Sequence, residues 1–267
     1  DYWRQQGNKG WGWDDVLPYF IKSENNELGK SKYHSDSGPI MVANKKINLK
    51  MLDEFQNAAE ECGIPRTKDF NTGDNTGIGF FQFTTNHNKS LLKLRCSTAK
   101  GYLNPIKKRR NLKIITHAHV QKINFEGKKA ESVNFYQGDK IVTIKAKREI
   151  ILSAGSIGSP HILQVSGIGD ANKLKKNGIT TINELKGVGM NLQDHLMFRP
   201  VYKVKNLKSL NRKINSLIGN FFIGLEYLFK QSGPMTMGAS QVCGFAKSDP
   251  SKETPNLQFH VQPISTD

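Results

Sequence analysis

The stretch of residues 150–170 limits the possible folds of this chain more than any other segment. It reads IILSAGSIGSPHILQVSGIGD, an apolar run followed by a dense set of small residues. The apolar residues within 148–153 are typical of a strand that is buried on both faces. The next residues, Ala154, Gly155 and Ser156, carry almost no side-chain bulk, so the main chain there can approach a flat or phosphate-bearing ligand closely.

A short helix is expected after this turn. Ser159 is placed to cap it, and Pro160 would occupy the first helical position, where a missing N–H costs nothing. The sequence SGIG at 166–169 would end the helix tightly. A helix start beside a glycine turn is a potential anion site. A tight strand-to-helix turn that binds nothing explains the same residues at least as well, so the residues alone leave both interpretations open.

The rest of the chain predicts both strands and helices. Strands are expected at 38–42, 79–83, 130–136, 140–146, 198–204 and 257–261, and one or two strands within 112–123. Helices are expected at 16–25, 52–62, 96–103 and 214–229. Some strands form a meander and others are followed by helices, which predicts an α/β (α+β mixed) fold with two lobes and no internal repeat. The helix at 214–229 is too short and too polar for a membrane span.

The charge of the chain raises the question of an anionic partner, because 39 Lys and Arg against 23 Asp and Glu give a formal net charge of +16. The one dense basic run, IKKRRN at 106–111, lacks interleaved aromatic residues for stacking on bases. We therefore expect lysines scattered over a solvated exterior, no nucleic-acid partner and no membrane span. The three cysteines, Cys62, Cys96 and Cys243, form no CxxC pair, which argues against a zinc site.

Five separated segments resemble the glucose–methanol–choline (GMC) family of flavin oxidoreductases, and they occur in the family's order. The segment GSIGSPHILQVSGIG at 155–169 resembles a signature of the family, and GVGMNLQDH at 187–195 resembles its G-V-G-x-N-L-Q-D-H motif. Upstream, GWGWDDVLPYF at 10–20, RCSTAK at 95–100 and HAHV at 117–120 resemble the insect branch, which includes glucose dehydrogenases.

The resemblance implies an FAD-dependent enzyme that oxidises a small-molecule alcohol to a carbonyl compound. In the family a hydride passes from the alcohol carbon to the flavin, a histidine assists loss of the hydroxyl proton, and a quinone or oxygen accepts the electrons. Ala154 and Gly155 match a family segment that passes beside FAD, and the backbone of Val120 matches a strand position at the adenine end. The alternative is that Val120 is a plain core residue of its strand; its side chain is expected in the core, and only its backbone would bind.

The resemblance also implies a division into an FAD/NAD(P)-binding fold portion interleaved with a substrate-binding sheet lobe. We expect a connecting or lid region at 1–30, the first part of the substrate-binding lobe at 31–90, the FAD-binding portion at 91–197 and a truncated second part of the lobe at 198–267. The family's GxGxxG fingerprint and its catalytic histidine have no match here, so we interpret the chain as an internal fragment without catalytic residues. Such a fragment would not bind FAD firmly or turn over alone.

Two other functions stay open: a catalytically degenerate family member, and a basic binding module.

Histidines at 117 and 119 would share one face of a strand, but no third metal ligand is evident, so a surface or core pair is favoured and no metal is expected. Asp194 beside His195 is interpreted as a structural turn, and His260 points either into a cavity or to water. The sequence leaves the localisation open, with secretion plausible from the family alone.

Overall fold

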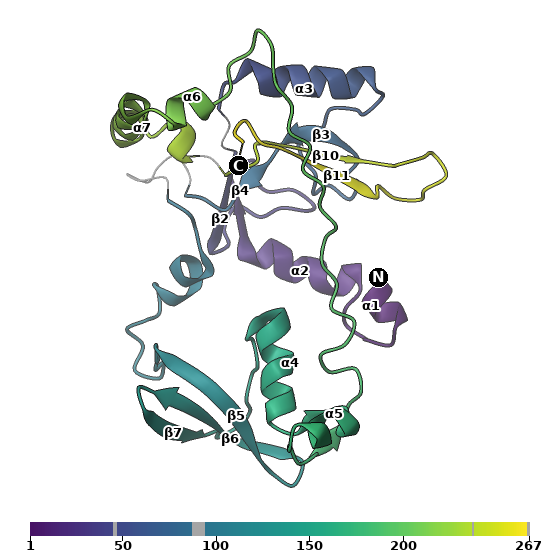
Figure 1. Cartoon of the computed structure of the whole chain (residues 1–267), viewed down its shortest axis with the longest axis vertical. Helices are drawn as coiled ribbons and strands as arrows, with labels where there is room; N and C mark the ends of the chain where they lie inside the picture. Colours follow the sequence, from purple (N-terminus) through teal and green to yellow (C-terminus); the bar gives the residue numbers. More distant parts are fainter. Residues whose placement is uncertain (45–46, 87–93, 237, 266–267) are drawn as a thin grey trace. The chain divides into compact units, whose positions relative to one another are not determined.

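The computed structural model describes residues 1–44, 47–86, 94–236 and 238–265, which separate into two compact units. Unit 1 combines Asp1–Arg109 with Pro200–Asp267, and unit 2 is Arg110–Arg199. Figure 1 shows helices and strands in both units, so the mixed α/β fold expected from the sequence is confirmed. Each unit is described by itself below.

Unit 1 contains a three-stranded antiparallel sheet covered by one helix. The sheet has the order β11 (Leu257–Val261), β10 (Val242–Ala246) and β3 (Gly77–Phe80), and helix α3 (Lys50–Glu61) packs beside β3 (Figure 1). The side chains that meet there are buried and apolar: Leu52, Ala59, Ile78 and Val242. Positions 52, 56 and 59 lie on one side of α3 because a helix repeats every 3.6 residues.

A second sheet of unit 1 follows the first long helix. Helix α1 (Tyr2–Gln5) precedes α2 (Trp13–Ser23), which begins with the Gly12 N–H donating to the Asp15 carboxylate at 3.0 Å. The chain leaves α2 directly into β1 (Glu24–Asn26), which runs parallel to β2 (Ile40–Asn44), and β4 (Gln82–Phe83) pairs antiparallel with β2. The position of β1 is thus fixed by both its neighbouring strand and the end of α2.

The remaining helices of unit 1 are short, with one exception. They are η1 (Ala99–Leu103), α6 (Asn211–Ile214), α7 (Leu217–Lys230) and η2 (Pro234–Thr236). The longest, α7, begins where the Ser216 hydroxyl accepts a hydrogen bond from the Gly219 N–H at 3.3 Å. Among the described residues no helix has the length and apolar character that crossing a membrane requires.

The strand expected at 198–204 is not formed, and this prediction was wrong. The segment has no strand hydrogen bonding, and its side chains, among them Phe198 and Tyr202, are exposed. Its alternating apolar residues favour an extended backbone. A strand also needs a neighbour for its N–H and C=O groups, which this segment does not have among the described residues.

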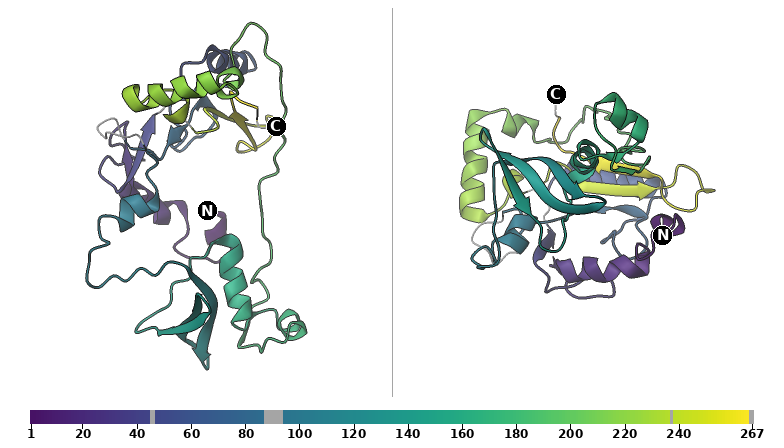
Figure 2. Two further views of the ribbon diagram at one scale, coloured as in Figure 1. Left: turned by 60° about the vertical axis from the view of Figure 1, so that its left-hand side comes forward. Right: turned by 90° about the horizontal axis from the view of Figure 1, so that it is seen from below.

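Unit 2 is an antiparallel meander with a helix against it. Strands β5 (Ala118–Glu126), β6 (Lys129–Gln137) and β7 (Lys140–Lys145) follow one another in sequence and in the sheet, whose twist is visible in Figure 2. Helix α4 (Gly155–Val165) packs on β5. The smaller elements are β8 (Ile168–Gly169), α5 (Ala171–Lys176) and β9 (Asn183–Glu184). The hairpin expected around Gly138 is confirmed. Of the one or two strands expected within 112–123, one is formed, and it begins only at Ala118.

Candidate functional site

The turn at Ala154 and Gly155 is the start of α4. Ala154 is the N-cap residue of the helix, and its N–H donates to the Ser159 hydroxyl at 2.9 Å. The prediction that Ser159 caps the helix and Pro160 opens it was therefore wrong, because Pro160 lies inside α4. Gly155 has a φ of +83°, a conformation that favours glycine, and the helix begins at this residue, one turn earlier than the proline suggests.

Pro160 is the sixth residue of α4 and so lies beyond the first turn, where a proline costs no hydrogen bond. A proline at this position removes the bond to the carbonyl four residues earlier, which belongs to Ser156. Ser156 is exposed, so its carbonyl can be hydrated instead. The sequence signal was correct in marking a helix start near proline, but it placed the start in the wrong turn.

The backbone of this turn is open. A Cβ atom added to Gly155 would meet no heavy atom within 4 Å, and Ala154 and Ser156 are exposed. The first N–H groups of any α-helix have no partner within the helix, and the helix dipole adds positive potential there. The residues present therefore fit a flat or anionic group lying along the main chain, which is what a dinucleotide offers.

The strand expected at 148–153 was also a wrong prediction. No strand is formed between the end of β7 at Lys145 and the start of α4, and the side chain of Ile151 is 79% exposed. The sheet β5–β6–β7 does not extend to this segment. An apolar run indicates that its side chains favour burial, but it does not identify the strands that would pair with it.

Val120 lies near the start of β5, half-buried, and pairs with Phe135 of β6. The sheet register shifts directly after it, between Val120 and Lys122. Strand β5 and helix α4 are joined by the Ile123 N–H, which donates to the Ser166 hydroxyl at 2.8 Å. The predicted residues thus lie on two packed elements, with the joining hydrogen bond at the far end of α4 from Gly155.

A second hydrogen bond fixes α4 against the following turn. The Gln164 amide donates to the Val188 carbonyl at 3.1 Å, and a Cβ on Gly189 would lie 2.6 Å from that amide nitrogen. The GVG sequence at 187–189 therefore has a packing role: glycine at 189 admits the Gln164 side chain. The glycine at 189 in this motif is therefore explained by packing alone, and no ligand is needed to account for it.

The other residues considered from the sequence do not form a site. His117 has a φ of +51° and precedes β5, so the two histidines at 117 and 119 do not share a strand face. Asp194 accepts the N–H of His195 at 2.8 Å in an exposed loop, as expected for a structural turn, and His260 is exposed. Among the described residues no group of three or more His, Cys, Asp and Glu is arranged to hold a metal ion.

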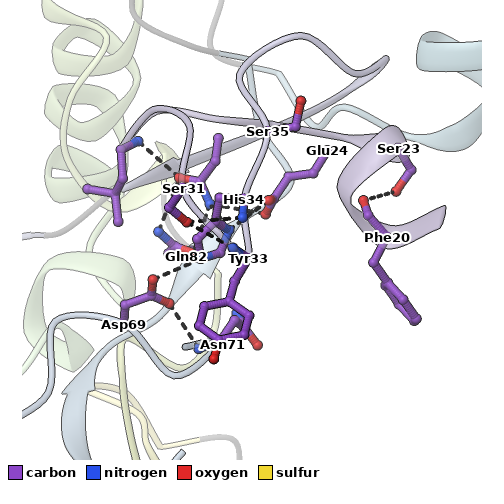
Figure 3. A network of polar contacts seen from close by, with 12 residues as sticks. Phe20, Ser23, Glu24, Ser31, Tyr33, His34, Ser35, Asp69, Asn71 and Gln82 are labelled. Atoms are coloured by element: carbon purple, nitrogen blue, oxygen red, sulfur yellow. Dashed lines mark hydrogen bonds and ion pairs between the residues drawn. The ribbon is translucent and has the colours of Figure 1, made fainter. Parts of the chain in front are cut away.

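One polar cluster was missed by sequence reasoning. His34 is 4% exposed, and its two ring nitrogens lie 2.7 Å from Glu24 Oε2 and 2.8 Å from Asp69 Oδ2 (Figure 3). Burial opposes the charged imidazolium, but hydrogen bonding and charge from Glu24, followed by Asp69, raise the pKa of His34 above its usual value. The three residues are distant in sequence and follow no recognisable spacing, so no local signal could have found them.

Comparisons with known proteins agree with the resemblance of the sequence. A family model described as GMC oxidoreductase matches residues 1–197. The oxygen-dependent choline dehydrogenase of Proteus mirabilis is 39% identical over 99% of this chain and 48% of its own length, and that of Pectobacterium atrosepticum is 37% identical over 99% and 47%. The chain thus spans about half the length of the curated relatives it matches.

Solved structures share the fold. An FAD-dependent oxidoreductase from Chaetomium thermophilum superposes with a TM-score of 0.78 and 28% identity, over 91% of this chain and 44% of the other. A formate oxidase superposes with a TM-score of 0.75 over 92% of this chain and 43% of the other, at 24% identity, which supports the fold alone.

Proposed function

The chain belongs to the GMC oxidoreductase family, and we propose that it forms part of an enzyme that oxidises an alcohol to a carbonyl compound by hydride transfer to flavin. FAD is the cofactor of this family and of its structural neighbour from Chaetomium. The observation that supports the proposal in this chain is the open turn with little side-chain bulk at Ala154 and Gly155, at the start of an 11-residue helix.

We assign the contacts with FAD to backbone rather than side chains. Gly155 and the exposed first turn of α4 offer N–H donors in a positive potential, which suits an anionic or polar edge of the cofactor. Ser159 holds the Ala154 N–H and so fixes the turn before the cofactor arrives. We propose that the main chain of Val120 borders the adenine end. When bound, FAD supplies the hydride acceptor.

No catalytic residue is assigned to this chain. The histidine that assists the proton transfer in this family has no counterpart that we identify here, and neither His195 nor His260 lies in a buried or polar site. The contribution of the chain is therefore to orient the cofactor and to build part of the substrate-binding lobe. The interpretation of the chain as an internal fragment remains a prediction.

The domain assignment is retained as a proposal. Unit 2 falls almost entirely inside the range 91–197 proposed as the FAD-binding portion, and unit 1 combines residues from both sides of it. That interleaved arrangement supports a substrate-binding lobe made from 31–90 and 198–267, with 1–30 as a connecting or lid region. A truncation that keeps only 110–199 should therefore lack the residues that select the substrate.

The substrate is proposed as a small alcohol. The bacterial relatives are choline dehydrogenases by name, whereas the segments at 10–20, 95–100 and 117–120 led us to predict the insect, glucose dehydrogenase-like branch. These branches can be separated by measuring the rate of oxidation of choline, a sugar and an aryl alcohol. Each substrate is assayed once with a quinone and once with oxygen as the electron acceptor. Preference for choline would refute the prediction of the insect branch without affecting the membership of the family.

The experiment that tests the proposed function is expression of the whole reading frame that contains this chain. A yellow product with the absorption bands of oxidised flavin, bleached by an alcohol in the absence of oxygen, is the expected result. A folded but colourless product would refute it and favour a degenerate family member. Retention on DNA or RNA that falls steeply with salt would instead favour a basic binding module.

A further inference from the structure

The buried cluster around His34 joins three separate segments of unit 1 (Figure 3). Glu24 is the first residue of β1, directly after α2, and Asp69 lies in the loop between α3 and β3. His34 lies between β1 and β2 and contacts both carboxylates. The side chains of His34, Glu24 and Asp69 are 5%, 18% and 14% exposed, so water screens these contacts only weakly.

The short distances determine how many protons the ring carries. A carboxylate oxygen only accepts hydrogen bonds, so each ring nitrogen must donate to hold contacts of 2.7 and 2.8 Å. The doubly protonated imidazolium alone provides both donors. The charged groups of the described residues that act on the ring are Glu24 from β1 and Asp69 from the loop before β3.

Asn26 supplies an alternative partner for one side of the ring. Its amide nitrogen lies 3.0 Å from Glu24 Oε1 and 3.1 Å from Nδ1 of His34, and the residue is 2% exposed. Its amide oxygen is already engaged by the Leu28 N–H at 3.0 Å, which fixes the orientation of the amide. In the imidazolium state the amide donates to Glu24. If Nδ1 loses its proton, the same amide can donate to Nδ1 without moving far.

We propose that His34 is a proton-operated clamp between the end of α2 and the loop that carries Asp69. In the closed state the imidazolium donates to both carboxylates. Loss of the Nδ1 proton to solvent lets the second N–H of the Asn26 amide bond to Nδ1 and breaks the charge-assisted bond to Glu24 Oε2. Glu24 is then held in this cluster only by the Asn26 donation to its Oε1. The Nε2–H keeps its bond to Asp69. The junction of α2 with β1 therefore loosens, while the Asp69 loop stays attached to His34.

The clamp gives a role to the region proposed as a connecting or lid segment. Because α2 belongs to residues 1–30, the clamp would set how firmly that segment is held to the first part of the substrate-binding lobe. This consequence rests on the proposed function. The clamp itself does not, because its protons can be observed in the 267-residue chain without FAD or substrate.

The first test is a pH titration of the histidine rings by two-bond ¹H–¹⁵N correlation spectra between pH 5 and 10. The His34 signals are identified by their loss in His34→Gln. We expect an imidazolium at low pH, a midpoint above the usual histidine value of 6.5, and an Nε2–H tautomer above the midpoint. A ring that is already neutral at pH 6, or an Nδ1–H tautomer at high pH, would overturn the proposal. The wild-type spectra are sufficient to decide this even if a variant misfolds.

The second test removes the charges one at a time. Glu24→Gln and Asp69→Asn keep an acceptor oxygen, and each should lower the His34 midpoint by about one pH unit or more. Asn26→Ala removes the substitute donor without adding a charge, together with the acceptor for the Leu28 N–H, so the preference for the Nε2–H tautomer should disappear. An unchanged midpoint in Glu24→Gln would show that the carboxylate does not act on the ring, and the clamp would be rejected.

Hydrogen exchange tests which side opens. After correction for the chemical exchange rate, peptides covering α2 and β1 should lose protection as the pH passes the His34 midpoint, while peptides covering 65–72 should not. In His34→Gln this pH dependence should be absent from both. Simultaneous loss of protection on both sides in the wild type would refute release at Glu24.

Discussion

Replacing Gly155 by alanine separates backbone strain from ligand contact at the proposed FAD turn. Gly155 has a φ of +83°, so an alanine there adopts a left-handed conformation that costs about 1–2 kcal/mol. The added Cβ would meet no heavy atom within 4 Å, so no packing penalty is added. We therefore expect Gly155→Ala to lower the free energy of unfolding by only about 1–2 kcal/mol.

Gly178→Ala is the matched control, because Gly178 has a φ of +71° in the same unit and its added Cβ would also meet nothing within 4 Å. Both variants should lose similar stability in urea denaturation. Gly167→Ala should lose clearly more, since its Cβ would lie 2.6 Å from the Thr180 carbonyl oxygen. A larger loss in Gly155→Ala than in Gly167→Ala would refute the description of the turn as open.

The FAD content of the full gene product supplies the second readout. A methyl group at position 155 would lie between the main chain and a cofactor placed along it, so Gly155→Ala should weaken FAD binding by about tenfold or more, or about 1.4 kcal/mol. Gly178→Ala should leave FAD binding unchanged. Equal FAD affinity in the two variants, at equal stability, would mean that the cofactor does not pass this turn.

Three further predictions concern stability and reactivity. Leu52→Ala, at a fully buried position of the α3–β3–β10 core, should cost about 2–5 kcal/mol in urea denaturation, and a loss below 1 kcal/mol would refute this core. The pKa of His34 is raised in the folded state, so the stabilisation from its charged form is complete below pH 6.5, the usual pKa of histidine, and is lost as the pH rises through the folded-state pKa. His34→Gln should flatten this part of the curve of unfolding free energy against pH. A curve that is the same in the variant and the wild type would contradict the prediction. A thiol reagent should label the exposed Cys62 rapidly in the native chain. Cys96 and Cys243 should react slowly because both are buried, and burial also raises the pKa of the Cys243 thiol. Rapid labelling of all three cysteines would contradict this packing.

Elements whose signal is local were predicted well from the sequence. Helix α3 was expected at 52–62 and spans Lys50–Glu61, and the hairpin around Gly138 was expected and observed. Helical periodicity and a glycine between two adjacent strands involve residues close in sequence, so neighbours alone define the structure. The resemblance to the GMC family rests on motifs of the same local kind.

Two strands expected from composition alone were wrong. The segments 148–153 and 198–204 have strand-like composition, yet neither forms a strand in the part of the chain that the structure describes. The small-residue turn at Ala154 and Gly155 was located correctly, but the start of α4 was not. The helix begins at Gly155 and has Pro160 in its interior, although proline usually prefers the first turn.

Local sequence patterns were enough to locate the turn with little side-chain bulk, to place the longer helices approximately, and to identify the family that the motifs resemble. The folded structure was needed to show that Glu24, His34 and Asp69 meet in one buried cluster and that the apolar run before α4 forms no strand. The physical reason is the range of the forces involved. Backbone preferences act between neighbours, whereas a buried ion pair or a strand ladder exists only after folding brings distant residues within hydrogen-bond distance.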